Sequence, residues 1–597
     1  MESLSTENNY GNDRGDKDFQ LVMRLFDIGK EQQKDYLETW KKCAKYYRGD
    51  NKYNKPGYKS DKRYNICRGV VQTYLPLMTD GQPGFNLVGQ EADDYEFGAK
   101  LGKVADAWWK RNGLQKKMVK IIHNSLEKGS GPLKVVWDNE LNNGQGDVNW
   151  ETVRCEDLFV PGNIEDAEKL PWVIERMYKS AAELKRMYPD KAKEIKGDNS
   201  KDKDDDRKSK DPSDAIMTTP TDQYSRVQGR DSSGMLMGDD TVEVLMCWID
   251  RKCVDEYDEI DGEEGEKQMK SKYPNGKLIV IAPNIGVKLF AGENPYEDAQ
   301  HPYVNIVDTV VPGEFWGQGE VEILFDLQDA LNDVINSIID YMKLTGNAVW
   351  FLPRAADVKT ENLINTQSLA IKYSGDTSPR RDFPPSLPSY YFDLLNTLLQ
   401  FVDNTSGAQD VTQGKKPIGI TAAEAIQTIQ EAAQTRVRLK DRNVDAGLNE
   451  AAKKTVSRFM QFYKDSRVAR MTGDLNGWPS YFEFSIEDAQ DGKKQMSYQE
   501  RTFDPNTKSF NEAATTGTTR PSKGMFDVEI VGGTSLPAKK AQMTNMAFKL
   551  FDMELIGADR LFETIDWPKR EEDAKAYNDK KAIEAQAVPP AVPGAPA

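Results

Sequence analysis

The stretch Gly319–Leu344 reads GEVEILFDLQDALNDVINSIIDYMKL, and it decides the fold class of the chain around it. Apolar side chains recur in it every three or four residues, which is the period of an α-helix that buries one side. These side chains are Leu324, Leu327, Leu331, Ile335, Ile338 and Met342. The stretch therefore predicts one continuous helix, which at 1.5 Å per residue is about 39 Å long.

Carboxylates dominate the other faces of this expected helix. Its acidic residues are Glu320, Glu322, Asp326, Asp329, Asp333 and Asp340. Only Lys343 opposes them on these faces. A surface of this kind repels a polyanion such as DNA, although a solvated acidic face of an ordinary helix has the same composition.

On the C-terminal side, the pattern predicts two further helices. A segment of short strands and prolines is followed by a helix over about 389–403 and by a polar loop with several glycines. The capping box Thr421–Glu424 then opens a helix that can run to Ser466, about 69 Å. Helices of this length need neighbours along their whole length, which an intramolecular bundle or adjacent subunits can supply.

On the N-terminal side, helical and strand patterns alternate. Residues 17–48 predict an amphipathic helix, and a second long helix is expected over 91–128. Period-two alternation over Leu133–Val153 predicts a β-hairpin, and Ser180–Glu183 forms a capping box. Strands are expected again at 241–250 and 277–282. This order of elements predicts an α+β fold.

Three segments contain too little apolar surface to fold, and we expect them to be disordered. They are residues 1–16, the charged insertion 196–240 and the Pro/Ala tail 584–597. Strands resume after Trp478, and a Met- and Phe-rich helical segment covers 539–565. The apolar side chains of that segment are expected to pack in a core.

Composition excludes several classes of protein. The 597 residues include 80 Lys and Arg against 96 Asp and Glu, so the net charge of −16 is opposite to that of a protein that grips DNA phosphates. No apolar run approaches the length of a membrane helix, and the acidic N-terminal stretch has no secretory signal. Five scattered cysteines indicate a reducing compartment.

Motifs for catalysis are missing. The sequence has no P-loop, no H-E-x-x-H, no C-x-x-C and no G-x-S-x-G. The two histidines, His123 and His301, are expected to be solvated or to cap backbone groups. The pair Cys247 and Cys253 lacks the further ligands that zinc needs. We therefore expect no enzyme, metal or cofactor, although a carboxylate-dependent nuclease or other hydrolase remains an alternative.

The order of segments resembles the portal (head–tail connector) proteins of tailed bacteriophages over about residues 17–567. The resemblance is carried by Gly313–Gly319 (GEFWGQG) with the helix that follows it, and by the long helix opening at Thr421. Trp40–Gly49 with the Leu75–Met78 run, and Phe526–Pro537 (FDVEIVGGTSLP), agree with it.

The resemblance implies an elongated α+β subunit with long stem and wing helices, small β-rich clip and wing sheets, and a helical C-terminal crown. It divides the chain into a wing (17–318), stem helix 1 (319–346), clip (347–388), stem helix 2 (389–404), tunnel loop (405–420), long wing helix with returning strands (421–538) and crown (539–583).

The resemblance also implies roles for particular residues. The tunnel loop would meet DNA through Gln413, Gly414, Lys415 and Lys416. The acidic stem wall would consist of Glu322, Asp326, Asp329, Asp333 and Asp340. In the clip, Arg354, Arg380 and Arg381 would contact other subunits or the packaging motor.

The implied function is a ring of typically twelve subunits, through which double-stranded DNA is packaged and ejected. Its partners would be the terminase large subunit, tail adaptor proteins, and the major capsid and scaffolding proteins, with no membrane. It would assemble in the host cytoplasm and reside at a vertex of the virion. An internal or adaptor protein of the virion, without the DNA-gating role, is the alternative.

Overall fold

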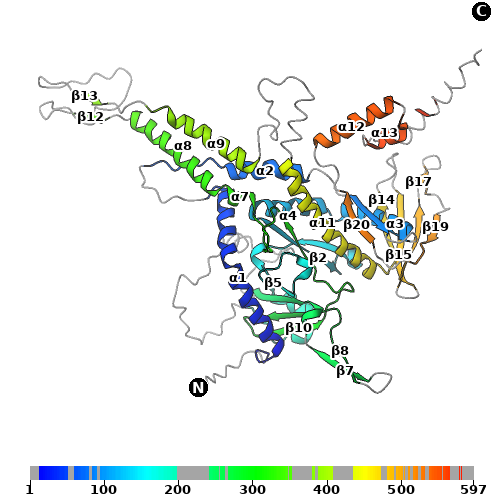
Figure 1. The fold of residues 1–597 in the computed structure, drawn as a ribbon. Coiled ribbons are helices and arrows are strands. Elements are labelled where there is room, and N and C mark those ends of the chain that lie inside the picture. The colour runs from blue at the N-terminus through cyan, green and yellow to red at the C-terminus, as the bar shows by residue number, and fades with distance from the viewer. Residues whose placement is uncertain are drawn as a thin grey trace, which may run out of the picture. The chain divides into compact units, whose positions relative to one another are not determined.

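The structure is a computed structural model, and the chain in it divides into two compact units (Figure 1). The sheet unit holds residues 1–41, 74–319 and 421–597, and the hairpin unit holds residues 42–73 and 320–420. The structure describes residues 13–50, 59–79, 84–89, 94–197, 241–254, 256–261, 267–346, 349–351, 380–382, 387–407, 435–471, 480–489, 493–501, 503–504, 509–510, 515–521, 526–531, 537–553, 555–564, 577–578 and 580.

A five-stranded antiparallel sheet forms the main core of the sheet unit. Its order is β10–β9–β6–β5–β4, with β4 at Leu158–Phe159, β5 at Trp172–Ser180, β6 at Thr241–Ile249, β9 at Lys277–Ala282 and β10 at Val287–Glu293. On one face, Ile174 lies opposite Cys247, and Cys247 lies opposite Ile279. Phe26 of helix α1 (Lys17–Arg48) packs on this face, while Trp248 belongs to a core cluster on the other. Because both faces are covered, every residue of β9 is buried.

The predicted hairpin at Leu133–Val153 is confirmed as part of a three-stranded sheet. Its order is β11–β2–β3, with β2 at Ser130–Asp138, β3 at Asp147–Thr152 and β11 at Tyr303–Val307. Trp150 of β3 packs edge-on against Trp108 and Trp109, with ring centroids 5.9 and 5.4 Å away.

The prediction of one helix over 91–128 is wrong. The structure has α3 at Asp94–Arg111 and α4 at Leu114–Lys128. Gly113 separates them with φ +58°, a left-handed conformation that an α-helix does not contain. Periodicity continues across this break because both helices bury their apolar faces in the same unit.

Smaller antiparallel sheets complete the strand content. β1 (Gly84–Gly89) pairs with β20 (Phe526–Val531), β7 (Tyr257–Asp261) with β8 (Lys267–Ser271), and β17 (Phe503–Asp504) with β18 (Ser509–Phe510). A four-stranded sheet has the order β14–β15–β16–β19, with bounds Arg467–Met471, Ser480–Asp488, Lys494–Arg501 and Thr515–Thr518. The described part of the chain is therefore mixed α+β with several small antiparallel sheets, as the fold class predicts.

The Met- and Phe-rich segment is helical but only partly packed. It forms α12 (Pro537–Asp552) and α13 (Ala558–Thr564), which contact each other. Met546, Phe548 and Leu555 are 62%, 45% and 69% exposed. The expectation that these side chains belong to a core is therefore wrong: Met546 and Phe548 lie on the outer side of α12, whose Ala547 is buried, and Leu555 lies in the link to α13.

The predicted disordered N-terminus includes four residues that the structure orders. Asp13–Asp16 lie at the start of α1, where Asp13 pairs with Lys191 at 3.1 Å and Asp16 pairs with Lys288. The other two segments expected to be disordered lie almost wholly outside the described residues.

The hairpin unit is built on two antiparallel helices that lie side by side, α8 (Phe325–Gly346) and α9 (Tyr390–Ser406), green and yellow-green in Figure 1. The short strands β12 (Val349–Phe351) and β13 (Arg380–Asp382) pair with each other between them in sequence. The single helix expected from Gly319 is interrupted, because α7 (Glu320–Ile323) ends before buried Leu324. The Leu324 N–H bonds to the Val321 carbonyl, which tightens the turn there.

Three further α-helices are described. They are α2 (Ile66–Thr79), α5 (Ala181–Met187) and α11 (Thr435–Phe462). The capping box that opens α5 is confirmed, since the Ser180 hydroxyl accepts a hydrogen bond from the Glu183 N–H at 3.1 Å. No described helix has the length and apolar character needed to cross a membrane.

Candidate functional site

The candidate site is the α8–α9 helix pair, which carries most of the residues predicted for a channel wall. Leu331 of α8 and Leu398 and Val402 of α9 are buried, as expected for two helices packed along apolar stripes. The two helices contain the carboxylates Asp326, Asp329, Asp333, Asp340, Asp393 and Asp403. Lys343 is the single cation of both helices, so the pair has a strong negative excess.

The five predicted stem-wall carboxylates have different environments. Asp326 and Asp333 are exposed on α8, and Glu322 is half-buried on α7. Asp329 accepts a hydrogen bond from the Tyr46 hydroxyl at 2.6 Å, and Asp340 accepts two from the Ser60 N–H at 2.8 and 3.1 Å. Two of the five are therefore engaged by the segment of the hairpin unit that precedes α2.

The last part of that segment together with the first two residues of α2, Ser60–Cys67, lies along α8 and is hereafter called the strap. Three amide side chains of α8 bind its backbone. The Asn332 oxygen accepts the Tyr64 N–H at 2.9 Å, and Asn336 binds both the N–H and the carbonyl of Lys62 at 2.7 and 2.8 Å. Gln328 accepts the Ile66 N–H at 2.8 Å and donates to the Tyr64 carbonyl at 2.5 Å.

The spacing of this ladder has a simple geometric reason. Gln328, Asn332, Asn336 and Asp340 follow one another every four residues, and thus lie about 6 Å apart along one face of α8. Two residues of extended chain advance by about the same distance, which places every second strap residue opposite the next side chain. Sequence reasoning missed this role, although the stripe Q-x-x-x-N-x-x-x-N-x-x-x-D along one face of the helix is its signal.

Asp340 stays charged at the end of the ladder. Hydrogen bonding from Ser60 holds the pKa of Asp340 below its ordinary value, with Lys343 adding to the effect. Lys343 in turn donates to the Ser60 hydroxyl, so one strap residue is held by an anion and a cation of α8.

The predicted clip and tunnel-loop residues are only partly within the described chain. Arg380 is exposed on β13 and lies opposite Phe351 of β12, and the backbone of Arg381 lies opposite Trp350. Arg354 and the tunnel-loop residues Gln413, Gly414, Lys415 and Lys416 lie outside the described residues.

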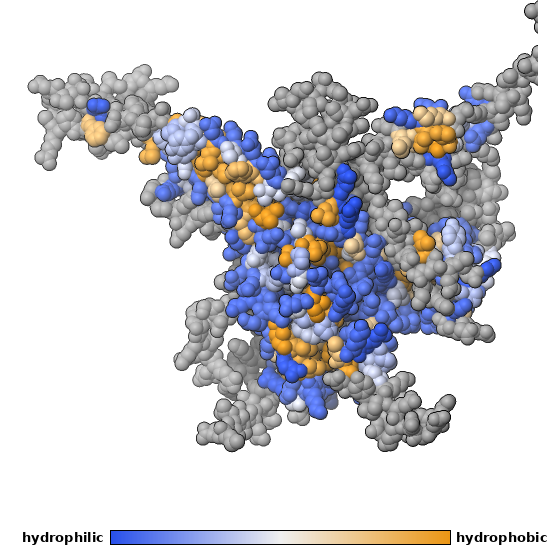
Figure 2. Space-filling view, in the orientation of Figure 1, coloured by the Kyte–Doolittle hydropathy of each residue, from blue (hydrophilic) through white to orange (hydrophobic). Residues whose placement is uncertain are grey.

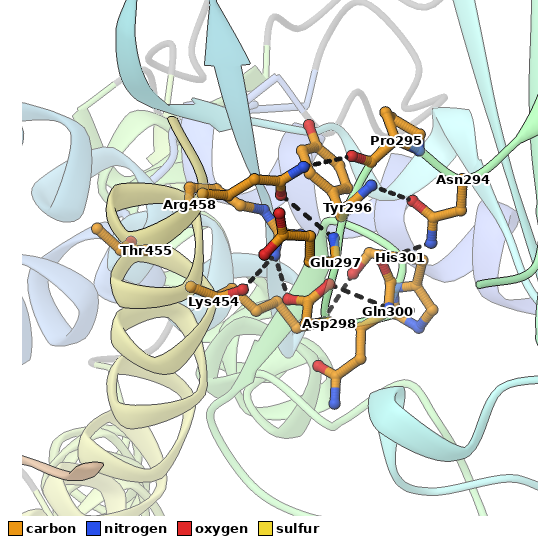
Figure 3. A network of polar contacts seen from close by, with 12 residues as sticks. Asn294, Pro295, Tyr296, Glu297, Asp298, Gln300, His301, Lys454, Thr455 and Arg458 are labelled. Carbon is orange, nitrogen blue, oxygen red and sulfur yellow. Dashed lines mark hydrogen bonds and ion pairs between the residues drawn. The ribbon is translucent and has the colours of Figure 1, made fainter. Parts of the chain in front are cut away.

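In the sheet unit, α11 is fastened by buried cations to the loop before β11 (Figure 3). Arg458, which has no exposed surface, pairs with Asp298 and places its guanidinium 3.7 Å from the Tyr296 ring centroid. Lys454 donates to the carbonyls of His301 and Tyr303 at 3.1 and 2.7 Å. Burial lowers the pKa of Lys454.

A second buried pair holds the preceding turns of the same helix. Lys440 contacts Asp308 at 2.6 Å, and the Asn443 amide donates to the Asp308 carbonyl at 2.9 Å. Since a buried charge needs a partner, these contacts fix which face of α11 meets the sheet. The apolar stripe in the sequence of α11 gave no indication that Lys440, Lys454 and Arg458 are buried.

His301 has a structural role here. Its Nε2 lies 2.7 Å from the Ala167 carbonyl and its Nδ1 lies 3.3 Å from the Tyr303 N–H, so the neutral ring donates to one and accepts from the other. Burial lowers the pKa of His301 to about 3, and Lys454 adds to the effect. The capping interpretation is the one that fits, because both ring nitrogens serve backbone groups.

The described residues contain no group of three or more His, Cys, Asp or Glu that could hold a metal ion. Cys247 is buried in β6, and burial raises its pKa, whereas Cys253 is exposed. A buried thiol with a raised pKa, such as that of Cys247, is unsuited to zinc binding or nucleophilic attack.

A family model described as the phage SU10 portal protein matches residues 115–487. The match covers more than half of the chain, and it includes α8, α9, α11 and the three-stranded sheet β11–β2–β3. No curated protein matches this sequence.

Proposed function

Because this chain belongs to the phage SU10 portal protein family, we propose that it forms the ring through which the genomic DNA of a tailed phage is packaged and ejected. Portal proteins are structural components of a virion vertex, not enzymes, and the family implies an oligomeric ring with a DNA passage. In the proposal, this ring holds typically twelve copies, docks the terminase motor during packaging and later receives the tail adaptors. The capsid and scaffolding proteins surround it.

The observation that carries the proposal is the charge of the α8–α9 pair. These two helices contain six carboxylates and one lysine, within a chain of net charge −16. A passage must let the duplex move without holding it, and each cation that pairs with a phosphate adds grip through counterion release. A wall of carboxylates repels the duplex toward the axis, and ring symmetry multiplies the effect.

Polar contacts hold α8 and α11 to the segments that pack on them, which supports a rigid channel wall. The strap is held to α8 by side chains over four turns, and α11 is held to its sheet by the buried pairs of Arg458 and Lys440. Such polar contacts are directional, so they resist sliding better than apolar packing alone.

The experiment is electron microscopy of the purified full chain, with class averages examined for symmetry. We expect rings with a central opening wide enough for a DNA duplex. A population of compact monomers, or rings without an opening, would contradict the proposal and favour an internal or adaptor protein. Metal-dependent cleavage of DNA by the same preparation would instead support the hydrolase alternative.

A further inference from the structure

The side of α9 that faces away from α8 carries several large apolar side chains. Five large apolar side chains of α9 are exposed in the structure. They are Tyr390 (59%), Phe392 (52%), Leu394 (43%), Leu399 (36%) and Phe401 (51%). Figure 2 shows apolar residues gathered over the α8–α9 pair, in orange.

These side chains form two separate flanks. At about 3.6 residues per turn, Tyr390, Leu394 and Phe401 fall on one side of α9, here flank A. Phe392 and Leu399 fall roughly half a turn away, here flank B. The buried stripe through Leu398 and Val402 that meets α8 lies between the flanks on the inner side.

On the outer side, a polar arc separates the two flanks. Its exposed members are Asp393, Asn396, Gln400 and Asn404. The arc contains no cation, since α9 has no lysine, arginine or histidine. A single α9 thus presents apolar, polar and apolar surfaces in sequence around its outer side.

The exposed apolar area of α9 is too small to form a stable interface without further contacts. Aromatic side chains cover about 150–250 Å² each, so the five residues together leave on the order of 400 Å² in water. This area is divided between two flanks, whereas a stable interface needs about 800 Å² per partner. The flanks alone are too small for a stable dimer, but they fit one part of a contact repeated around a closed ring.

We propose that flank A of one copy packs on flank B of the next copy, and that the polar arc of α9 faces the DNA. This inference rests on the proposed function, since it names which surfaces of the helix pair meet which partners. Contacts between two different patches of one chain are heterologous, and they close into a ring when the rotation allows it. A single partner, or a twofold dimer, would require one flank and leave the other in water.

The strap explains why α9 rather than α8 has this role. The Gln328–Asp340 face of α8 is covered by Ser60–Cys67, and its apolar face is covered by α9. With both neighbours of α9 in place, the surface left open between them is the arc. An arc without cations forms no ion pair with a phosphate, which suits sliding of the duplex.

The first test concerns the flanks, in the full-length chain. Leu394→Asp alters flank A, Leu399→Asp alters flank B, and Asn396→Asp puts the same charge on the arc as a matched control. Oligomer size is measured by mass photometry, and circular dichroism checks that each variant keeps its helical content. We expect rings from the wild type and from Asn396→Asp, and at least a tenfold loss of rings from each flank variant.

Mixing the two flank variants separates the modes of contact. In a heterologous arrangement, intact flank A of Leu399→Asp meets intact flank B of Leu394→Asp, so the mixture gains paired subunits that neither variant forms alone. Rings that persist in both flank variants, or pairing of one variant with itself, would overturn the inference. If the wild type forms no rings, the proposed function fails instead.

The second test concerns the arc. A photo-crosslinking amino acid replaces Gln400 on the arc or Ser337 on the exposed acidic face of α8 in DNA-filled particles. We expect crosslinks to DNA from position 400 and at least fivefold fewer from position 337. The reverse result would overturn the inference and put Asp326 and Asp333 of α8 on the DNA.

Discussion

Single buried charges determine how the long helix α11 of the sheet unit is held. Arg458 of α11 has no exposed surface, and its partner Asp298 comes from a loop far away in sequence. Removing one member of such a pair leaves the other charge without compensation in a poorly hydrated place. The cost is therefore much larger than for an ion pair in water.

We expect Arg458→Met to lower the free energy of unfolding by about 3 kcal/mol, because Asp298 loses its partner. The matched control is Lys464→Met, whose pair with Asp488 is more than half exposed on both sides and contributes about 0–1 kcal/mol. Urea unfolding of the full chain at neutral pH measures both. Equal effects of the two variants would show that the Arg458 pair contributes no more than a surface pair.

His301 makes the stability depend on pH. Its pKa is about 3 in the folded chain and about 6.5 when unfolded, so the unfolded chain binds one more proton between these values. The stability contributed by the neutral ring is complete above pH 6.5 and is lost as the pH falls toward 3. Between pH 7 and pH 5 we expect a loss of about 1–2 kcal/mol from this residue.

The measurement compares urea midpoints at pH 7 and pH 5 for the wild type and His301→Gln, which keeps a donor and an acceptor. The variant should lose less stability on acidification than the wild type. Identical losses would mean that His301 titrates normally in the folded chain.

At the scale of elements, the strap changes what α8 presents to its surroundings. An extended segment covers one face of this helix through bonds between side chains and backbone, and it engages Asp340. Asp329 is bound by Tyr46 of α1 instead. The acidic helix expected from composition is thereby divided into a covered face and an exposed face. Of the predicted wall residues, Asp326 and Asp333 lie on the exposed face.

We expect Asn336→Ala to loosen the strap, since it removes partners of both the N–H and the carbonyl of Lys62. Leaving two partly buried backbone groups unpaired costs about 1–3 kcal/mol locally. Hydrogen exchange should show amides of residues 60–66 exchanging roughly tenfold faster or more. Ser337→Ala, one residue away on the exposed face, should leave their exchange unchanged, and equal protection in both variants would contradict the ladder.

At the scale of the whole molecule, the negative net charge suits a protein that surrounds DNA without binding it. Reversing one charge per subunit on the surface that faces DNA acts once per copy in a ring, so small local changes add up. The arc of α9 is that surface in our inference. A substitution there should alter DNA movement without altering the fold.

We expect Asp393→Lys to slow packaging several-fold, because each copy would add a phosphate contact. The amount of nuclease-protected DNA in assembled particles measures this effect over time. Asp333→Lys adds the same charge to the exposed face of α8, one helix farther from the duplex in our inference, and should slow packaging less. A slower rate only for Asp333→Lys would place α8, not α9, against the duplex.

Local sequence patterns were sufficient to predict many of the helices and strands. The amphipathic period of residues 17–48 predicted α1 at its observed bounds, and the strand expected at 277–282 is β9. The capping box at Ser180 was also confirmed, because caps, hairpins and buried strands depend on residues close in sequence. The acidic excess of the helix pair is likewise a property of composition alone.

Other features were decided only when distant segments came together. The left-handed Gly113 and the break at Leu324 interrupt helices whose apolar period continues, so periodicity could not reveal them. The burial of Arg458 and Lys454, and the strap on the amide ladder of α8, depend on partners more than 100 residues away. An apolar stripe shows that a helix has a buried side, but the choice of what covers each polar face is made by hydrogen bonds that exist only in the tertiary structure.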